Sequence, residues 1–102
     1  MAKSREELQN LLENILGSRH VYFQPPESVK MQYPAIIYSR SNIQNTFANN
    51  SVYAQNIAYE MIVIDKNPNS EIVKKLSLLP FCRHNRNYQS ENLNHDAFTI
   101  YF

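Results

Sequence analysis

The segment Gln55–Asn67 constrains the fold of this chain more than any other stretch. Its residues alternate between two sets that are both mainly apolar: Ile57, Tyr59, Met61 and Val63 on one side, and Ala58, Ile62 and Ile64 on the other. A strand that is apolar on both sides is typical of the interior of a sheet with cover on both faces. We therefore expect a central strand, which ends where turn residues and Pro68 interrupt the ladder.

The length and charge of the chain exclude several classes of protein. Its 102 residues predict a single domain. The formal net charge is +1, without the basic stripe that a nucleic-acid binder of this size usually carries, so we expect no sequence-specific nucleic-acid partner. Gly17 is the only glycine, which excludes Gly-rich phosphate-binding loops.

The distribution of apolar residues and cysteine also limits where the protein works. No apolar run is long enough to cross a bilayer, and the charged N-terminal segment is not followed by the apolar stretch of a signal peptide. Cys82 is the only cysteine, so no intramolecular disulfide forms, which fits a reducing compartment. We expect no membrane association.

Two segments have the pattern of amphipathic helices. In Ser4–Leu16, Ser4 and Glu7 fit a capping box, apolar residues recur at helical spacing, and Gly17 follows where a left-handed C-cap belongs. In Asn69–Leu79, Asn or Ser precedes the first turn and Pro80 ends the pattern. We expect both apolar stripes to pack on the domain's own sheet.

Further segments predict the remaining strands of that sheet. They are His20–Phe23 as a short strand, Pro34–Arg40, the polar edge strand or exposed hairpin arm Phe81–Tyr88, and the closing strand Asp96–Phe102, with a turn at Gln89–His95. The expected order is helix, strand, hairpin or loop, strand, helix, strand, strand. This is an α+β fold with two helices on one side of a mainly antiparallel sheet.

The segment Ser41–Asn56 allows two interpretations. It is polar and rich in Asn, and Asn49-Asn50-Ser51 is a plausible turn because Asn tolerates left-handed backbone. The segment is either a hairpin that extends the two flanking strands or a long loop. A loop of that length in so small a domain is unusual and often functional.

No combination of residues predicts an active site. Cys82 and His84 lie two apart and share a strand face, but no further ligands or base follow at a useful spacing. His95 and Asp96 are adjacent, so on a strand they face opposite ways. Arg83 and Arg86, with His84, form a small basic group that fits an acidic partner or a solvated edge. We expect no catalytic residues, no metal and no cofactor.

Four segments carry a resemblance to a known family: QPPESVKMQYPAIIYSRSNI, NTFANNSVY, YEMIVIDKNPNSEIVKKL and LNHDAFTIYF. In this order they resemble the tail terminator, or tail completion, proteins of long-tailed phages, which are encoded among the head–tail joining genes of phages and prophages. The resemblance covers nearly the whole chain. It depends on the order of the elements and on the YEMIVID strand followed by a helix, and it includes no catalytic motif.

The resemblance implies a structural protein of the virion, present in the bacterial cytoplasm during assembly. Such proteins have an α+β fold, form hexameric rings, cap the tail tube and present a surface to the head connector. The implied partners are copies of this chain, the major tail protein and a head-side connector protein. No site residue transfers, so the expected interaction residues come from the polar segment and the edge strand: Asn45, Thr46, Phe47, Asn49, Asn50, Tyr53, Arg83 and Arg86.

Three alternatives remain open at this point. The first is a head-side connector or stopper protein from the same gene neighbourhood. The second is a small enzyme that uses Cys82, His84 and Asp96. The third is a regulatory binding module. The near-neutral charge and the lack of a helix-turn-helix pattern argue against one that binds DNA.

Overall fold

The computed structural model describes residues 4–25, 30–48 and 51–102; for residues 44, 46–48 and 51–56 it describes the backbone alone. The described chain forms two helices and five strands, in the α+β class that the sequence predicts. Their order and bounds are α1 (Arg5–Leu16), β1 (Val21–Phe23), β2 (Ala35–Ala48), β3 (Ser51–Asp65), α2 (Glu71–Ser77), β4 (Cys82–Ser90) and β5 (Leu93–Tyr101).

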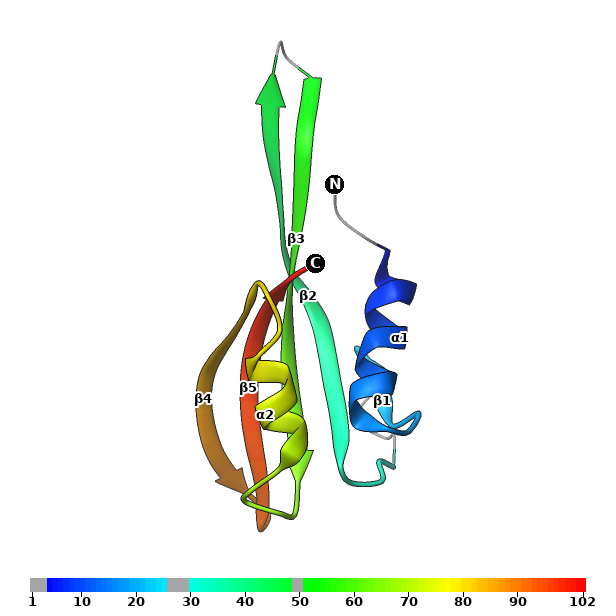
Figure 1. The fold of residues 1–102 in the computed structure, drawn as a ribbon, viewed down its shortest axis with the longest axis vertical. Helices are drawn as coiled ribbons and strands as arrows, with labels where there is room; N and C mark the ends of the chain where they lie inside the picture. The colour runs from blue at the N-terminus through cyan, green and yellow to red at the C-terminus, as the bar shows by residue number, and fades with distance from the viewer. Residues whose placement is uncertain (1–3, 26–29, 49–50) are drawn as a thin grey trace.

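The strands form one sheet in the order β1-β2-β3-β5-β4. Only the β1–β2 pair is parallel, and the other three pairs are antiparallel. The strand predicted from Gln55–Asn67 belongs to β3, which has a neighbour on each side and is the middle strand of the five (Figure 1). The expectation of a central strand is therefore confirmed.

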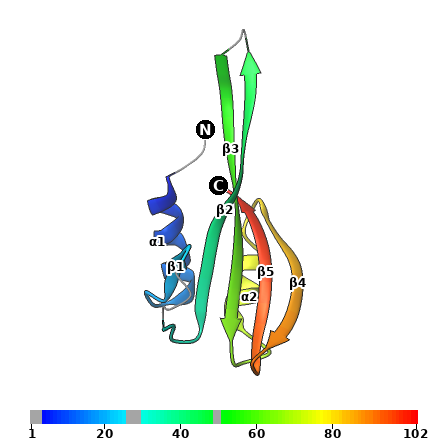
Figure 2. The ribbon, with the colours of Figure 1, turned by 180° about the vertical axis from the view of Figure 1, so that it is seen from behind.

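Both helices lie on the same side of the sheet, as the views from the front and from behind show (Figures 1 and 2). They bury their apolar stripes against alternate residues of the strands. The buried core contains Leu8 and Leu12 of α1, Ile72 and Leu76 of α2, and Val21, Ile36, Tyr38, Tyr59, Met61, Val63, Phe98 and Ile100 of the sheet. Burial of each such side chain stabilises the fold by about 2 kcal/mol.

The other face of the sheet carries no helix in the described part of the chain (Figure 2). Ala58 and Ile64 of β3 are buried there, but Ile62 and its β2 partner Ile37 are only half-buried. The expectation that both faces of the central strand are covered is therefore met on one face only. The alanine and β-branched isoleucines of this face are typical of strands, so the face is apolar in sequence although no helix covers it in the described part of the chain.

The caps of α1 agree with the sequence. Ser4 accepts a hydrogen bond from the Glu7 amide at 3.2 Å, and Gly17 adopts left-handed backbone with a φ of 80°. The second helix spans Glu71–Ser77 and is therefore shorter than the predicted Asn69–Leu79. The residues after it turn toward β4. The residues before the helix form two successive turns instead. The Asn67 amide donates to the Asp65 carboxylate, and the Asn69 amide donates to the Asn67 side-chain oxygen.

The turn between the last two strands is much tighter than predicted. Residues Gln89–His95 were expected to form it, but β4 continues to Ser90 and β5 begins at Leu93. The two residues between them, Glu91 and Asn92, have φ values of 54° and 64°. A two-residue connection with both φ values positive suits the right-handed twist of the flanking strands, so the ladder extends further than the polar sequence suggests.

The segment Ser41–Asn56 is a hairpin and not a loop. Pairing between β2 and β3 runs from Ala35↔Ile64 at one end to Ala48↔Ser51 at the other. The predicted turn residues Asn49 and Asn50 lie outside the described residues. The hairpin projects beyond the rest of the sheet (Figures 1 and 2), and the radius of gyration is 14.7 Å, against about 13 Å for a compact chain of this length.

Candidate interaction surface

The projecting part of the hairpin begins where the neighbouring strands end. We define the arm as Asn42–Ala48 of β2 and Ser51–Ile57 of β3. On one side, β1 pairs with β2 only as far as Tyr38; on the other, β5 pairs with β3 only as far as Ala58. Beyond these positions β2 and β3 pair with each other, so the arm is a two-stranded ribbon.

A β-bulge marks the base of the arm. The β2–β3 register shifts between Arg40 and Asn42, which leaves Ser41 as the extra residue of β2. The Ser41 hydroxyl donates a hydrogen bond of 3.1 Å to the Ala58 carbonyl oxygen. Bulges add local twist and bend the strand that carries them, so this one sets the direction in which the arm leaves the sheet.

The arm has an unusual composition for an exposed ribbon. All ten Lys and Arg residues, all nine Asp and Glu residues and all five prolines lie outside the range 41–59. Protein edges are normally protected from pairing with other chains by charges, prolines or short length. The arm has neither charges nor prolines. It is rich in Asn and Gln, whose side chains support stacking between β-chains.

The structure places the predicted arm residues on the two strands of the ribbon. Asn45 is exposed and pairs in register with Gln55. The backbones of Thr46 and Phe47 belong to β2 and that of Tyr53 to β3. Asn49 and Asn50 fall outside the described residues.

An apolar surface lies at the base of the arm, on the side of the sheet that carries the helices. Its defining residues are Ile43, Ile57, Leu78, Phe81 and Phe102, which we call the apolar shelf. Leu78 is 85% exposed, Phe81 is 78% exposed and Ile43 is 43% exposed. Ile43 pairs with Ile57, and the Phe102 amide donates to the Ile57 carbonyl at 3.0 Å.

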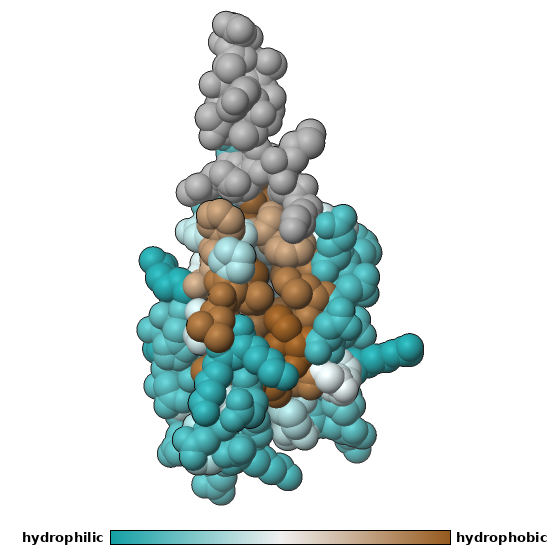
Figure 3. Space-filling model, in the orientation of Figure 1, coloured by the Kyte–Doolittle hydropathy of each residue, from teal (hydrophilic) through white to brown (hydrophobic). Residues whose placement is uncertain are grey.

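The space-filling view shows an apolar area between the helices that continues up to the arm (Figure 3). Exposed apolar groups of this kind are candidates for contact with another protein. Sequence reasoning missed it, although Leu78 lies off the apolar stripe of α2 and Phe81 follows a helix-ending proline. Those two positions were the available signal.

The edge strand β4 carries the two predicted arginines on one face of the sheet. The β4–β5 register shifts between His84 and Arg86, and this bulge puts Arg83 and Arg86 on the face without helices, opposite Thr99 and Ala97. His84 points to the helix face, where its ring meets that of Phe98 at 5.0 Å. The basic group expected from Arg83, Arg86 and His84 is therefore divided between two faces.

Arg83 and Arg86 make local contacts and keep their charge exposed. The Arg83 Nε donates to the Asn85 side chain at 3.3 Å, and the Arg86 guanidinium lies 4.9 Å from the ring centre of Tyr88. Tyr88 in turn stacks on His95 at 4.9 Å. The edge thus presents a positively charged, partly aromatic surface on β4.

His84 and Asp96 come together on the helix face of β4 and β5, whereas Cys82 lies further along β4, opposite Ile100. The His84 Nε2 atom lies 3.0 Å from the Asp96 Oδ1 atom, and both side chains are partly accessible to solvent. Burial raises the pKa of the Cys82 thiol, which disfavours the nucleophilic thiolate. Alternate residues of a strand stand about 6.8 Å apart along it, so Cys82 and His84 are not preset as a nucleophile and base.

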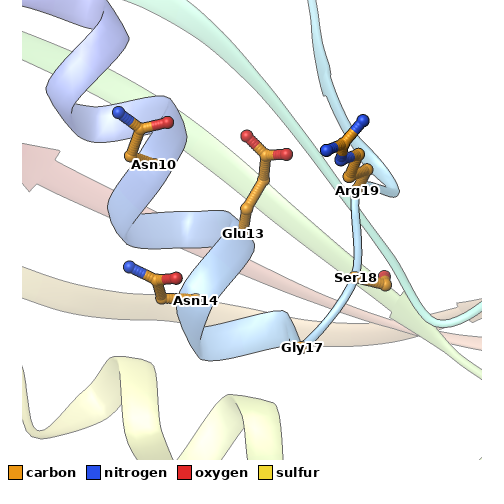
Figure 4. A pocket seen from close by; sticks show the side chains of 6 residues that line it. All are labelled: Asn10, Glu13, Asn14, Gly17, Ser18 and Arg19. Atoms are coloured by element: carbon orange, nitrogen blue, oxygen red, sulfur yellow. The ribbon is translucent and has the colours of Figure 1, made fainter.

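Figure 4 shows a polar depression at the C-terminal end of α1. It is lined by Asn10, Glu13, Asn14, Gly17, Ser18 and Arg19. None of these six residues is buried, and none has an apolar side chain. A ligand site normally combines an apolar enclosure with a few converging polar groups, so this depression has no features of a binding pocket.

The described residues contain no group of three or more His, Cys, Asp or Glu side chains that could hold a metal ion. Neither α1 nor α2 is long and apolar enough to cross a membrane.

No protein-family model and no curated protein matches the chain. The fold and its surfaces define an α+β protein with a projecting, uncharged β-arm. Its function therefore has to be argued from that arm, the apolar shelf and the charged edges.

Proposed function

We propose that this protein is a phage or prophage tail terminator, a structural protein that caps the tail tube as a ring and joins it to the head connector. The observation that carries the proposal is the arm, a projecting two-stranded ribbon with no charged residue. Such a ribbon offers backbone groups and amide side chains to other protein chains. The protein acts by assembly in the virion and not by catalysis.

The opposite edges of the body support a head-to-tail ring. At the β1–β2 edge, α1 exposes Glu6 and Glu7. At the opposite edge, β4 exposes Arg83 and Arg86 on the face without helices, and α2 exposes Lys74 and Lys75 on the other face. An interface between two different patches repeats from copy to copy and closes when the rotation allows, and opposite charges favour that arrangement over a symmetric dimer.

The arm then faces the ring lumen or the tail tube. It projects along the long direction of the molecule, away from both charged edges (Figure 1). It therefore stays free for the tube when α1 and β4 make the contacts between subunits. The apolar shelf at its base adds surface to the same contact.

Deletion of residues 45–52 tests this function. The deletion removes the end of the arm and leaves every buried core residue in place, so the protein should fold and yet fail to cap tails. Capping is measured as tail length by electron microscopy after purified tubes are mixed with the variant. Normal far-UV circular dichroism and a normal unfolding transition verify the fold, and capping that survives the deletion contradicts the proposed role of the arm.

A second binding experiment separates the two head–tail junction roles. Purified tail tubes and portal-bearing capsids are each mixed with the intact protein, and bound protein is measured after sedimentation. A tail terminator associates with the tubes. Association with the capsids alone assigns the protein to the head side, as a connector or stopper, and overturns the proposal.

A charge exchange tests the ring contacts separately. Arg83→Glu with Arg86→Glu should prevent capping, and so should Glu6→Lys with Glu7→Lys, because each pair places like charges across the interface. The chain with all four substitutions should recover capping, since the complementarity is restored with its sign reversed. Failure of the combined variant to recover, in a folded protein, argues against this choice of edges.

A further inference from the structure

The turn between α2 and β4 holds two large apolar side chains away from the core. Leu78 is 85% exposed and Phe81 is 78% exposed, whereas Leu79 is half-buried and packs against the core. The Leu79 amide donates to the Leu76 carbonyl at 3.1 Å, and the Phe81 carbonyl accepts from the Tyr101 amide at 3.0 Å. These bonds fix the backbone of the turn, so Leu78 and Phe81 are presented in set positions.

The backbone of Phe81 is unfavourable for a residue of its size. Its φ of 60° lies in the left-handed region, where a bulky side chain is an outlier and Gly or Asn is preferred. The position combines this backbone with an exposed aromatic ring, and neither feature stabilises the isolated fold. Residues held in such conformations cluster at ligand-binding and functional sites, which makes Phe81 a candidate contact residue.

The charged residues around the apolar shelf have one sign. The shelf residues come from three ranges of the sequence, 41–59, 72–90 and 97–102, and these ranges contain no Asp or Glu. Their basic residues are Lys74, Lys75, Arg83 and Arg86. Lys74 and Lys75 are exposed on α2, and Lys74 lies one helical turn before Leu78. A partner that fits this surface should therefore carry carboxylates beside its apolar residues.

The acidic residues next to these ranges do not change the sign of the border. Glu71 lies 3.5 Å from the Lys74 Nζ atom, and the Asp96 side chain is 13% exposed and accepts a hydrogen bond from β4. Glu60 alternates with the buried residues of β3 and so faces the side of the sheet without helices. Glu91 lies in the turn between β4 and β5. The helix side of the shelf is therefore apolar with a positive border.

A second copy of this chain does not supply the matching surface. Outside the shelf, the large apolar side chains that are exposed in the described chain are Tyr33 and Tyr101, at 37% and 43%. The exposed carboxylates of α1, Glu6 and Glu7, share that helix with exposed polar residues and no exposed apolar one. Contact of shelf with shelf would bring the lysines of two copies together, which opposes the contact. These surfaces favour a different protein as the partner.

We propose that the apolar shelf binds a segment of a different protein in which large apolar side chains are flanked by Asp or Glu. Leu78 and Phe81 pack on the apolar side chains of that segment, and Lys74 and Lys75 pair with its carboxylates. This inference rests on the proposed function for the identity of the partner, the subunit of the tail tube, and on the shelf alone for the chemistry of the segment. The apolar contacts supply affinity, and the charges select the partner.

A titration followed by nuclear magnetic resonance tests this chemistry on the full-length purified protein. The probes are two short synthetic peptides, one in which Leu and Phe are flanked by Asp and Glu, and one in which Lys replaces every acidic residue. The acidic peptide should shift the amide signals of Leu78, Phe81 and Ile43, and the basic peptide should bind several-fold more weakly. Added salt should reduce the difference between the peptides, because it screens charges on the surface.

Two double variants separate the apolar and the charged contributions. Leu78→Ser with Phe81→Ser should weaken binding of the acidic peptide by roughly tenfold, since both exposed apolar side chains are removed. Lys74→Glu with Lys75→Glu should reverse the preference in favour of the basic peptide. Tyr33→Ser, at an exposed apolar residue outside the shelf, is the matched control and should bind as the parent does. Thermal unfolding verifies that each variant is folded.

Other outcomes overturn the inference and assign the shelf elsewhere. Equal binding of the two peptides, or signal shifts confined to another surface, contradicts an acidic segment at the shelf. Binding of vesicles of phosphatidylcholine and phosphatidylserine that depends on Leu78 and Phe81, without peptide binding, assigns the shelf to a membrane surface. Self-association that the same double variant abolishes, again without peptide binding, assigns it to a second copy.

Tail capping is measured in parallel, so that the two proposals can fail separately. Binding of the acidic peptide at the shelf by a protein that leaves tails uncapped keeps this inference and removes the proposed function. Full capping by the variant with Leu78→Ser and Phe81→Ser, together with no peptide binding by the parent, keeps the proposed function and removes this inference.

Discussion

The Nε2 atom of His84 lies 3.0 Å from the Oδ1 atom of Asp96, across the β4–β5 pair. The Asn87 side chain donates to the same oxygen, also at 3.0 Å. The Asp96 side chain is only 13% exposed, whereas that of His84 is 39% exposed. The two donors flank the bulge between His84 and Arg86, so Asp96 ties the edge strand to the sheet where its ladder is interrupted.

Asp96→Ala should therefore lower stability. The change removes two side-chain hydrogen bonds, and the expected loss is about 1–2 kcal/mol in the free energy of unfolding. Urea unfolding measures it as a lower midpoint with an unchanged slope. Asn87→Ala, which removes one of the two bonds, should cost less. Equal stability of the Asp96→Ala variant and the parent would show that these bonds contribute nothing net.

A structural role and an enzymatic role make opposite predictions for Cys82 and His84. If Cys82 and His84 are structural, Cys82→Ala and His84→Ala should leave phage production unchanged. The measurement is plaque yield after complementation of a deletion with each variant. A large loss of yield in a stably folded variant would favour catalysis by this group over a role in assembly.

A pair of leucines separates the core from the interaction surface. Leu12 of α1 is fully buried, and Leu12→Ala should destabilise the fold by about 3 kcal/mol. Leu78 is 85% exposed on the apolar shelf, so Leu78→Ala should change stability by less than about 0.5 kcal/mol.

Only the second variant should lose association while keeping its fold. Sedimentation measures the association and thermal unfolding measures the stability. Normal association of the Leu78→Ala protein would remove Leu78 from the proposed interface. A stability loss as large as that of Leu12→Ala would mean that its side chain packs in the fold.

Much of the fold could be predicted because local signals and tertiary packing agree. In α1, the Ser4 cap, the apolar stripe and Gly17 all specify the same helix. The alternation in β3 likewise specifies an interior strand, although it overstates the cover on the second face. The turn before β5 was misjudged because Glu91 and Asn92 carry positive φ values that only the strand pairing on either side requires.

The candidate surface was less accessible to sequence reasoning. The sequence predicts the Asn-rich segment as an interaction element, but periodicity cannot distinguish a hairpin from a loop, because the pairing partner of each residue is set by register. The separation of Arg83 and Arg86 from His84 depends on a bulge, which shifts alternation by one residue without a sequence signal. The exposure of Leu78 and Phe81 depends on how α2 ends.

The stability of the fold should fall at alkaline pH, because burial raises the pKa values of the Cys82 thiol and the Tyr38 phenol. Burial raises the pKa of the Cys82 thiol above its ordinary value of 9.0. Burial likewise raises the pKa of the Tyr38 phenol above 10.0, although the hydrogen bond from Arg5 opposes this. A raised pKa in the folded state gives stability that is complete below the unfolded value and is lost as the pH rises through the folded value.

The free energy of unfolding should therefore decline from about pH 9 upward. Cys82→Ala should remove the first part of the decline, and Tyr38→Phe should remove the part that begins near pH 10. Urea unfolding between pH 8 and 11 provides the measurement, with Tyr101→Phe as the control for an exposed phenol. A Cys82→Ala profile that matches the parent would show that the thiol does not contribute.

Two serines that precede helices should respond in opposite ways to the same substitution. Ser4 caps α1 by accepting from the Glu7 amide, so Ser4→Ala should cost about 1 kcal/mol. Ser70 precedes α2 without making a side-chain cap bond, and its buried hydroxyl oxygen has no hydrogen-bond partner. A buried polar atom without a partner is unfavourable, so Ser70→Ala should leave stability unchanged or raise it. Thermal and urea unfolding of the two variants gives the comparison, and a loss at Ser70 as large as the loss at Ser4 would mean that its hydroxyl finds a partner in solution.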